Sequence, residues 1–156
     1  MLNLIGEYEC RLDAKQRLAL PAGLLRQLPA EGEGQLVVNR GFEQHLTLYP
    51  ITEWRRISAE INQLNLYVRK HRDFARYFYR GASELKPDSH HRILLPKRLL
   101  EYAAIQDRVV LFAYANRIEV WSPALYETQL GAEPEDFSGL AEAVMGQAGW
   151  PGGEPS

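Results

Sequence analysis

The chain contains two copies of one sequence unit, and this repeat limits its possible folds more than any other feature. When residues 6–25 are placed over residues 81–100, eight of the 20 positions are identical, whereas unrelated segments share about one. The identical pairs are Gly6/Gly81, Glu9/Glu84, Asp13/Asp88, Arg17/Arg92, Leu20/Leu95, Pro21/Pro96, Leu24/Leu99 and Leu25/Leu100. Each unit is too small to bury a core alone, so the sequence predicts that the two units pair in a pseudo-two-fold β structure.

Each unit carries the same expected elements in the same order. A first strand leads to an Asp-x-x-x-Arg segment, then a short apolar piece ends at a proline where a short helix begins. Two further strands follow when Val37-Val38 is aligned with Val109-Val110. The expected short helices are 22–28 and 97–103, and the expected strands are 35–39, 45–49, 108–112 and 117–121.

Helices are also expected between the repeats and after the second one. The spacing of apolar residues predicts helices over 51–66 and 68–79. Thr52 and Ser122 are candidates for N-caps, because a hydroxyl group can accept the otherwise unpaired N–H groups of a first helical turn.

Composition excludes several classes of protein. Hydrophobic residues make up 46% of the 156 positions and charged residues 24%, with a net charge of −2, which excludes a disordered polyelectrolyte and a histone-like basic coat. No apolar run approaches the ~18 residues of a membrane span, and no secretory signal pattern is present, so we expect a cytoplasmic protein. The lone Cys10 excludes an intramolecular disulfide framework and a multi-cysteine zinc site.

Charge is unevenly distributed along the chain. Residues 127–156 contain six acids and no Lys or Arg, which leaves 18 basic and 14 acidic residues, or +4, in residues 1–126. We expect the C-terminal segment to be an acidic, flexible tail with at most one weak helix over 133–146. Such a tail either improves solubility or competes with an anionic ligand for a basic face.

The two Asp-x-x-x-Arg segments are the main candidates for a functional site. Asp13 and Asp88 can accept backbone N–H bonds within a turn and can hold Arg17 and Arg92 in bidentate pairs. Such pairs could also serve only to stabilise the repeat. Lys15 places a point charge near the planar guanidinium of Arg17, a combination suited to phosphate groups and guanine edges.

Other basic residues are weaker candidates. Arg11 alternates with Glu7 and Glu9 on a predicted strand and is as compatible with a surface ion pair as with a ligand contact. Farther along the chain, arginines recur every three or four residues on one side of a predicted helix. This stripe is typical of a solvated face or an interface, with phosphate binding as the alternative. Its members are Arg69, Arg72, Arg76 and Arg80.

The sequence does not favour an enzyme. Asp13 and Asp88 each precede an arginine by four residues, which lowers a carboxyl pKa and disfavours a general acid. Cys10 could be paired with His45 or His71 as nucleophile and base, but a lone cysteine on a half-buried strand is typical of a core position.

A metal or phosphate cofactor is not expected either. His90 and His91 are adjacent and cannot easily face one metal ion, and no third ligand is suggested nearby. No phosphate-binding glycine loop is present. The sequence therefore predicts no catalysis, no cofactor and no metal.

Several motifs, in order and with the right repetition, resemble the MraZ family over about residues 5–126. The first unit carries Gly-Glu-Tyr-Glu-x-x-Leu-Asp-x-Lys-x-Arg-Leu-x-Leu-Pro-Ala, then Arg-Gly-Phe and Leu-Tyr-Pro-x-x-Glu-Trp. Phe-Ala-Arg-x-Phe follows, and the second unit carries Asp-x-x-x-Arg-Ile-Leu-Leu-Pro and Asn-Arg-Ile-Glu-Val-Trp-Ser. Gln16 and His91 depart from the family pattern, which has glycine there and so permits a positive φ.

The resemblance implies a fold class. It implies a β-rich α+β protein, a pseudo-two-fold AbrB-like (SpoVT-AbrB) swapped-hairpin, or double-split, β-barrel built from the two internal repeats, with peripheral helices. On this basis we expect the first repeat at 7–54, a helical connector at 55–82, the second repeat at 83–126 and the acidic tail at 127–156.

The resemblance also implies a function. Family members are bacterial regulators that bind short G-rich direct repeats in double-stranded DNA upstream of the division and cell-wall gene cluster. We therefore expect a sequence-specific regulator of transcription, acting on its own promoter among others and associated with the nucleoid. We also expect homo-oligomeric rings of eight or more subunits and no membrane partner. The alternative is a non-enzymatic oligomeric scaffold or an antitoxin-like protein-binding module.

The expected site residues follow from the resemblance and from the chemistry of the loops. We expect base-edge contacts first from Arg17, with Lys15 beside it on a phosphate or base. Arg92 is the counterpart in the second loop and Arg11 a weaker candidate. The loop-structuring residues are Asp13 and Asp88.

Overall fold

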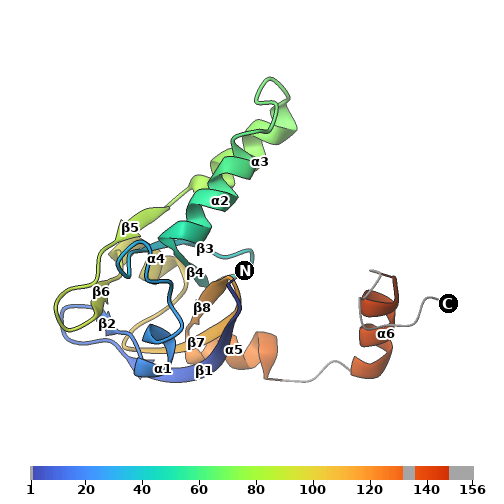
Figure 1. Ribbon diagram of the computed structural model, residues 1–156. Coiled ribbons are helices and arrows are strands. Elements are labelled where there is room, and N and C mark those ends of the chain that lie inside the picture. The colour runs from blue at the N-terminus through green and yellow to red at the C-terminus, as the bar shows by residue number, and fades with distance from the viewer. Residues whose placement is uncertain (1, 132–135, 148–156) are drawn as a thin grey trace. The chain divides into compact units, whose positions relative to one another are not determined.

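The computed structural model describes residues 2–131 and 136–147. Two compact units divide the chain, the first ending at Leu125 and the second beginning at Tyr126. Figure 1 shows the helices and strands in chain order. They are β1 (Leu4–Arg11), β2 (Arg17–Ala19), α1 (Ala22–Leu25), β3 (Leu36–Arg40), β4 (Leu46–Pro50), α2 (Ile51–Ile61), α3 (Arg69–Tyr79), β5 (Ser83–Leu85), β6 (Arg92–Leu94), α4 (Lys97–Tyr102), β7 (Arg108–Ala115), β8 (Arg117–Trp121), α5 (Pro123–Leu130) and α6 (Phe137–Gln147).

The strand order has the symmetry of the sequence repeat. A six-stranded antiparallel sheet runs β1-β7-β8-β4-β3-β5, and a separate two-stranded ribbon pairs β2 with β6. Exchanging the repeats replaces β1 by β5, β2 by β6, β3 by β7 and β4 by β8, and vice versa. Both orders are then the same when read from the opposite edge. The pairings of β1 with β7 and of β3 with β5 each join one repeat to the other. The prediction that the two sequence repeats pair with each other is confirmed.

The strand register corrects the alignment of the repeats by one residue. Cys10 pairs with Val109, and its counterpart Leu85 pairs with Leu36. Leu36, and not Val37, therefore corresponds to Val109. Both strands carry buried apolar residues at consecutive positions, so the sequence pattern there cannot distinguish one register from the next.

The strands do not close into the expected barrel. Within the described residues they form one open sheet, with β1 and β5 at its edges, and one separate ribbon. After β1, the backbone N–H of Leu12 donates to the carbonyl of Asp107 at 2.7 Å and prolongs the pairing. Pro87 stands at the equivalent place after β5 and has no N–H to donate. The pairing is not prolonged there, and β5 is only three residues long.

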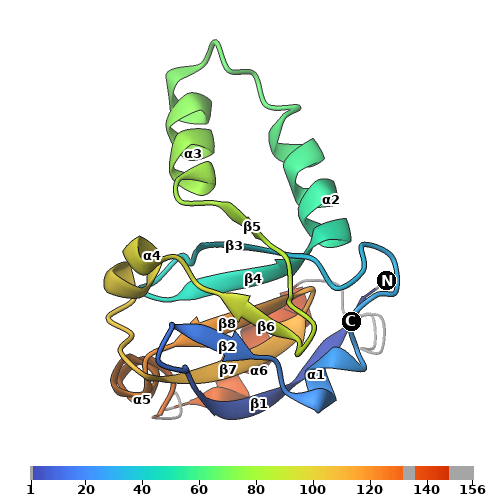
Figure 2. The same cartoon turned by 90° about the vertical axis from the view of Figure 1, so that its left-hand side faces the viewer.

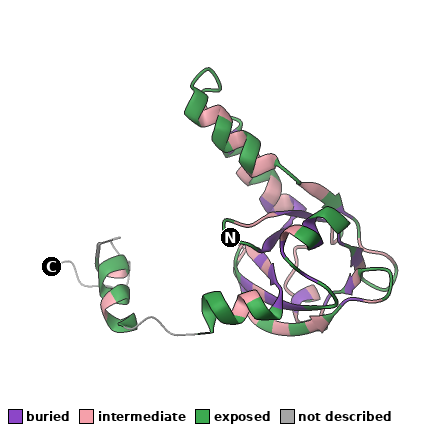
Figure 3. Ribbon diagram, turned by 180° about the vertical axis from the view of Figure 1, so that it is seen from behind, coloured by how far each residue is buried: buried purple, intermediate pink, exposed green. Residues whose placement is uncertain are grey.

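The ribbon covers the hydrophobic core on one face of the sheet (Figures 2 and 3). Leu18 of β2 and Ile93 of β6 are fully buried and lie opposite each other across the ribbon. Leucine, valine and isoleucine side chains of the sheet, α1 and α4 complete the same cluster. Because side chains alternate between the two faces of a strand, the residues on either side of Leu18 and Ile93 point outward.

Each repeat also holds the turn of the other. The backbone N–H of Leu20 donates to the carbonyl of His91 at 3.1 Å, and the N–H of Leu95 donates to the carbonyl of Gln16 at 3.4 Å. These two bonds are related by the exchange of repeats. The turns before β2 and β6 are therefore fixed at opposite ends of one ribbon.

One of the two predicted caps is present. The hydroxyl of Ser122 accepts the N–H of Leu125 at 3.2 Å and caps α5. Thr52 does not cap a helix, because α2 begins one residue earlier, at Ile51, directly after Pro50. Together α2 and α3 form a helical hairpin that extends away from the sheets (Figure 2), and both are shorter than predicted.

The second unit contains the helix α6, at Phe137–Gln147. The predicted weak helix over 133–146 overlaps with it, although residues 133–135 lie outside the described part of the chain. Over the residues that the structure describes, no helix combines the length and the apolar character needed to cross a membrane.

Candidate nucleic-acid interface

The first Asp-x-x-x-Arg segment is a tight turn organised by its aspartate. Oδ1 of Asp13 accepts the backbone N–H groups of Lys15 at 2.9 Å and Arg17 at 2.8 Å. Oδ2 accepts Nε–H of Arg17 at 2.7 Å. The N–H of Asp13 donates to the carbonyl of Arg17 at 3.0 Å, so the turn is closed by both main chain and side chain.

The second turn repeats this arrangement with the same donors. Oδ1 of Asp88 accepts the N–H groups of His90 at 2.8 Å and Arg92 at 3.0 Å, and Oδ2 accepts Nε–H of Arg92 at 2.8 Å. Hydrogen bonds to a carboxylate favour its charged form. The backbone N–H of Arg92 is the largest cause that lowers the pKa of Asp88 to about 2. The equivalent bond from Arg17 lowers the pKa of Asp13.

The ion pairs in both turns use a single nitrogen, so the expectation of bidentate pairs was wrong. One carboxylate oxygen is occupied by backbone N–H groups, which leaves only the other for the guanidinium. Because that contact uses Nε, the Nη1 and Nη2 groups of Arg17 and Arg92 remain for another acceptor. Their side chains are 28% and 30% exposed, so both remain partly open to solvent.

Gln16 and His91 keep the turn geometry that glycine would allow. Their φ angles are 62° and 60°, the left-handed conformation that costs little only for glycine. The N–H of Gln16 donates to the carbonyl of Asp13 at 2.9 Å, and that of His91 to the carbonyl of Asp88 at 3.0 Å. The departure from the family pattern therefore leaves the loop conformation the same in both repeats.

The two arginines share the outer side of the ribbon. Arg17 lies opposite Leu94, and Ala19 lies opposite Arg92. The pair of residues between them is buried, so these four side chains point outward together. We call Arg17, Ala19, Arg92 and Leu94 the ribbon face. Lys15 is exposed in the turn that leads into it.

Arg11 lies on the sheet and not on the ribbon. It ends β1, is exposed together with Glu7 and Glu9 as predicted, and lies opposite Arg108 of β7. Like charges directly opposite each other on neighbouring strands repel. An anion near Arg11 and Arg108 would relieve this repulsion, so Arg11 remains a candidate for a phosphate contact. It is a weaker candidate than Arg17 and Arg92, because it does not lie on the ribbon.

The arginine stripe of α3 supports the helical hairpin. Nη1 of Arg72 donates to two backbone carbonyls of the loop before α3, both at 3.0 Å. Arg69 and Arg76 lie 3.8 and 3.9 Å from Asp73 and are 87% and 73% exposed. Such exposed pairs add at most ~1 kcal/mol to stability. The geometry is that of a solvated helix face with one arginine ordering the loop.

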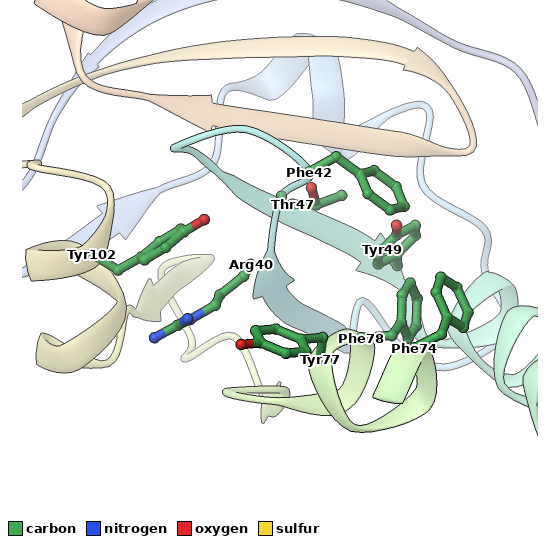
Figure 4. Close-up of a pocket in the computed structure, with 9 residues that line it drawn as sticks. Arg40, Phe42, Thr47, Tyr49, Phe74, Tyr77, Phe78 and Tyr102 are labelled. Atoms are coloured by element: carbon green, nitrogen blue, oxygen red, sulfur yellow. The ribbon is translucent and has the colours of Figure 1, made fainter. Parts of the chain in front are cut away.

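An aromatic pocket of about 460 Å³ lies between the sheet and the helices (Figure 4). The guanidinium of Arg40 lies 4.3 Å from the ring centre of Tyr102, and its buried Nε has no hydrogen-bond partner among the described residues. Phe42 and Tyr77 are 77% and 70% exposed. The pocket is lined by Arg40, Gly41, Phe42, Thr47, Tyr49, Phe74, Tyr77, Phe78 and Tyr102. These residues suit the binding of an apolar or anionic surface.

The residues considered for catalysis have other roles. Cys10 packs against the core, and burial raises the pKa of its thiol, which disfavours the reactive thiolate. His45 is buried and stacked on Trp121 with ring centres 4.3 Å apart, and burial lowers its pKa. Among residues 2–131 and 136–147, no group of three His, Cys, Asp or Glu side chains is placed to hold a metal ion.

Comparison with known proteins gives one match for each repeat. The family model described as "MraZ protein, putative antitoxin-like" matches residues 4–77 and 78–146. The chain belongs to the MraZ family. The family is one of transcriptional regulators and not of enzymes, so the predictions of family and of a non-enzymatic protein are confirmed.

MraZ relatives from three bacteria match nearly the whole chain, each named transcriptional regulator MraZ. The protein of Christiangramia forsetii is 40% identical over 94% of this chain and 95% of its own length. That of Cytophaga hutchinsonii is 39% identical over 90% and 93%. That of Herpetosiphon aurantiacus is 41% identical over 90% and 95%.

Two features of the candidate surfaces were missed in the sequence. Leu94 belongs to the run Ile-Leu-Leu-Pro, which reads as a continuous buried segment, but the structure leaves it 59% exposed. The alternation required by the buried Ile93 was the signal that could have found it. The pocket around Arg40 and Tyr102 joins distant segments, and no local pattern marks it.

Proposed function

We propose that this MraZ-family chain regulates transcription by binding double-stranded DNA through the ribbon face. A two-stranded β-ribbon fits the major groove of B-DNA. The observation that carries the proposal is the pair of guanidinium groups on one ribbon, each oriented through Nε by its own aspartate. Nη1 and Nη2 are then available for O6 and N7 of guanine, the most common specific contact of arginine.

The proposed roles differ between the residues. Arg17 reads a base edge, and Lys15 binds a neighbouring phosphate as a point charge. Arg92 is the counterpart of Arg17 on the second strand of the ribbon. Arg11 adds a flanking phosphate contact beside Arg108, whose charge it faces.

Following the family resemblance, we propose that the chain acts as a ring of eight or more copies. Its targets are short G-rich direct repeats upstream of the division and cell-wall genes, including its own promoter, on the nucleoid in the cytoplasm. One copy offers few cations, so its affinity for DNA is low at physiological salt. Copies held side by side bind adjacent repeats at high effective concentration without further contacts in each copy.

A binding assay tests the proposal on the DNA upstream of the chain's own gene. Arg17→Ala is expected to weaken binding by ~1–3 kcal/mol, the contribution of one good base contact. Lys15→Ala is expected to weaken binding to specific and scrambled DNA alike, because phosphates carry no sequence information. Arg69→Ala, which removes the same charge from the exposed face of α3, is the matched control. Equal losses for Arg17→Ala and Arg69→Ala would contradict the proposal.

The aromatic pocket favours a second candidate, a non-enzymatic oligomeric scaffold or antitoxin-like protein-binding module. Phe42 and Tyr77 expose large rings beside Arg40, as binding surfaces for proteins often do. Equal and weak binding to specific and scrambled DNA would favour this candidate. Light scattering of Tyr77→Ala tests whether the same surface holds copies together, and a smaller assembly is expected.

A further inference from the structure

The two arms of the ribbon face carry different side chains beside their arginines. Exchange of the repeats places Arg17 on Arg92 and Ala19 on Leu94. One arm is therefore an arginine opposite a leucine, and the other is an arginine opposite an alanine. Leu94 is 59% exposed, and hydration of its apolar surface is unfavourable until something covers it.

The distance across the ribbon lies between one and two steps of the base stack. Cβ atoms of directly opposed residues on antiparallel strands lie about 4.5–5.5 Å apart, and successive bases of one DNA strand are separated by about 3.4 Å. When Arg17 contacts O6 and N7 of a guanine, Leu94 therefore lies over a neighbouring base pair. The apolar group that the floor of the major groove offers there is the C5-methyl of thymine.

We propose that Leu94 determines specificity by packing on the C5-methyl of a thymine next to the guanine that Arg17 contacts. The inference rests on the proposed function and deepens it. Beside Arg92, the shorter side chain of Ala19 does not make the equivalent contact with a thymine methyl group. The ribbon therefore distinguishes the two directions of its site despite its internal symmetry, as recognition of direct repeats requires.

Replacement of thymine by deoxyuridine tests the proposal, because it removes only the methyl group. The probe is a duplex that the full chain selects from a random-sequence library, with each thymine replaced in turn. The wild-type chain is expected to lose about fourfold in affinity at one thymine next to a guanine, the equivalent of ~0.8 kcal/mol for one buried carbon. Leu94→Ala is expected to lose at least as much on the unmodified duplex and to bind both duplexes equally.

Two further variants complete the experiment. Leu94→Met keeps an apolar side chain of similar reach and is expected to retain the discrimination. Ile5→Ala removes an apolar side chain that is more exposed than Leu94 from β1, outside the ribbon, and is expected to bind as wild type does.

The outcomes separate this inference from the proposed function. A selected site without a sensitive thymine, or undiminished discrimination in Leu94→Ala, would overturn the role of Leu94. If Arg17→Ala still loses affinity in that case, the proposed DNA contact stands without it. If the wild-type chain selects no sequence at all, the proposed function fails and the inference fails with it.

Discussion

Gln16 and His91 hold a backbone conformation that their side chains disfavour. A left-handed φ costs a non-glycine residue about 1–2 kcal/mol. Gln16→Gly and His91→Gly each remove this cost, but glycine also increases the entropy of the unfolded chain, which offsets part of the gain. The net rise in the free energy of unfolding is expected to be ~1 kcal/mol at most, measured in urea titrations.

A substitution to glycine at another position of the same turn provides the control for this prediction. Ala14 does not have a positive φ, so Ala14→Gly gains no relief and is expected to destabilise the chain. If Gln16→Gly destabilised the chain as much as Ala14→Gly does, the cost assigned to the φ of Gln16 would be wrong.

Asp88 ties stability to pH through its hydrogen bonds. Its pKa in the folded chain is about 2, below the ordinary value of about 3.9. A carboxyl with a lowered pKa stabilises the fold above its unfolded pKa and loses this contribution as the pH falls through the folded value. Asp88→Asn is expected to be less stable than wild type at pH 7, with a smaller difference near pH 2. Thermal melts across this range measure both, and a difference independent of pH would refute the assignment.

The chemistry of the turns could be predicted from the sequence, but its geometry could not. The spacing of Asp13 and Arg17 indicated a turn with an ion pair, because short polar side chains bond to nearby backbone. The single Nε contact depends on which oxygen the backbone N–H groups occupy. Leu94 was hidden because outward and inward leucines look alike in one apolar run.

The β2–β6 ribbon is the element on which both repeats depend. Ile93 is fully buried opposite Leu18, and truncation of such a side chain leaves a cavity. Ile93→Ala is expected to lower the free energy of unfolding by ~2–5 kcal/mol. Leu94→Ala, one residue away on the exposed side, is expected to change it by less than ~0.5 kcal/mol. Denaturant titrations measure both, and equal effects would contradict the assigned faces of the ribbon.

The helices and strands were predicted correctly where local sequence patterns determine them. The strand register and the closure of the sheet, which depend on pairing between distant segments, were not. The order of strands and helices followed from periodicity and proline positions. The one-residue slip between Val37 and Val109 arose because both strands are buried on both faces. The prediction of a closed barrel was wrong partly because Pro87, after β5, has no N–H to extend the strand pairing. This effect is visible only once the pairing of β1 is known.

At the scale of the whole molecule, charge separates the acidic end from the rest of the chain. Five acids and no Lys or Arg follow Gly131, and negative charge near a DNA-binding protein slows association. A chain ending at Gly131 is expected to bind DNA several-fold faster at low salt. The advantage is expected to shrink above ~0.15 M salt, where screening acts within about 8 Å.

Stopped-flow association with a labelled duplex measures this effect. The matched control is the full chain with the five acids replaced by their amides, which removes the charge and keeps the length. If truncation accelerated binding and the amide variant did not, the bulk of the segment and not its charge would be responsible.

The mutual pairing of the repeats has a consequence for the continuity of the chain. Ladders between strands of different repeats, and the bonds to the carbonyls of Gln16 and His91, hold the halves together on both sides of the core. The covalent link between them runs through the tip of the α2–α3 hairpin, away from those ladders. Two separately expressed fragments, divided near Asn65, should therefore find each other and reassemble, while either fragment alone would leave half of every shared ladder open.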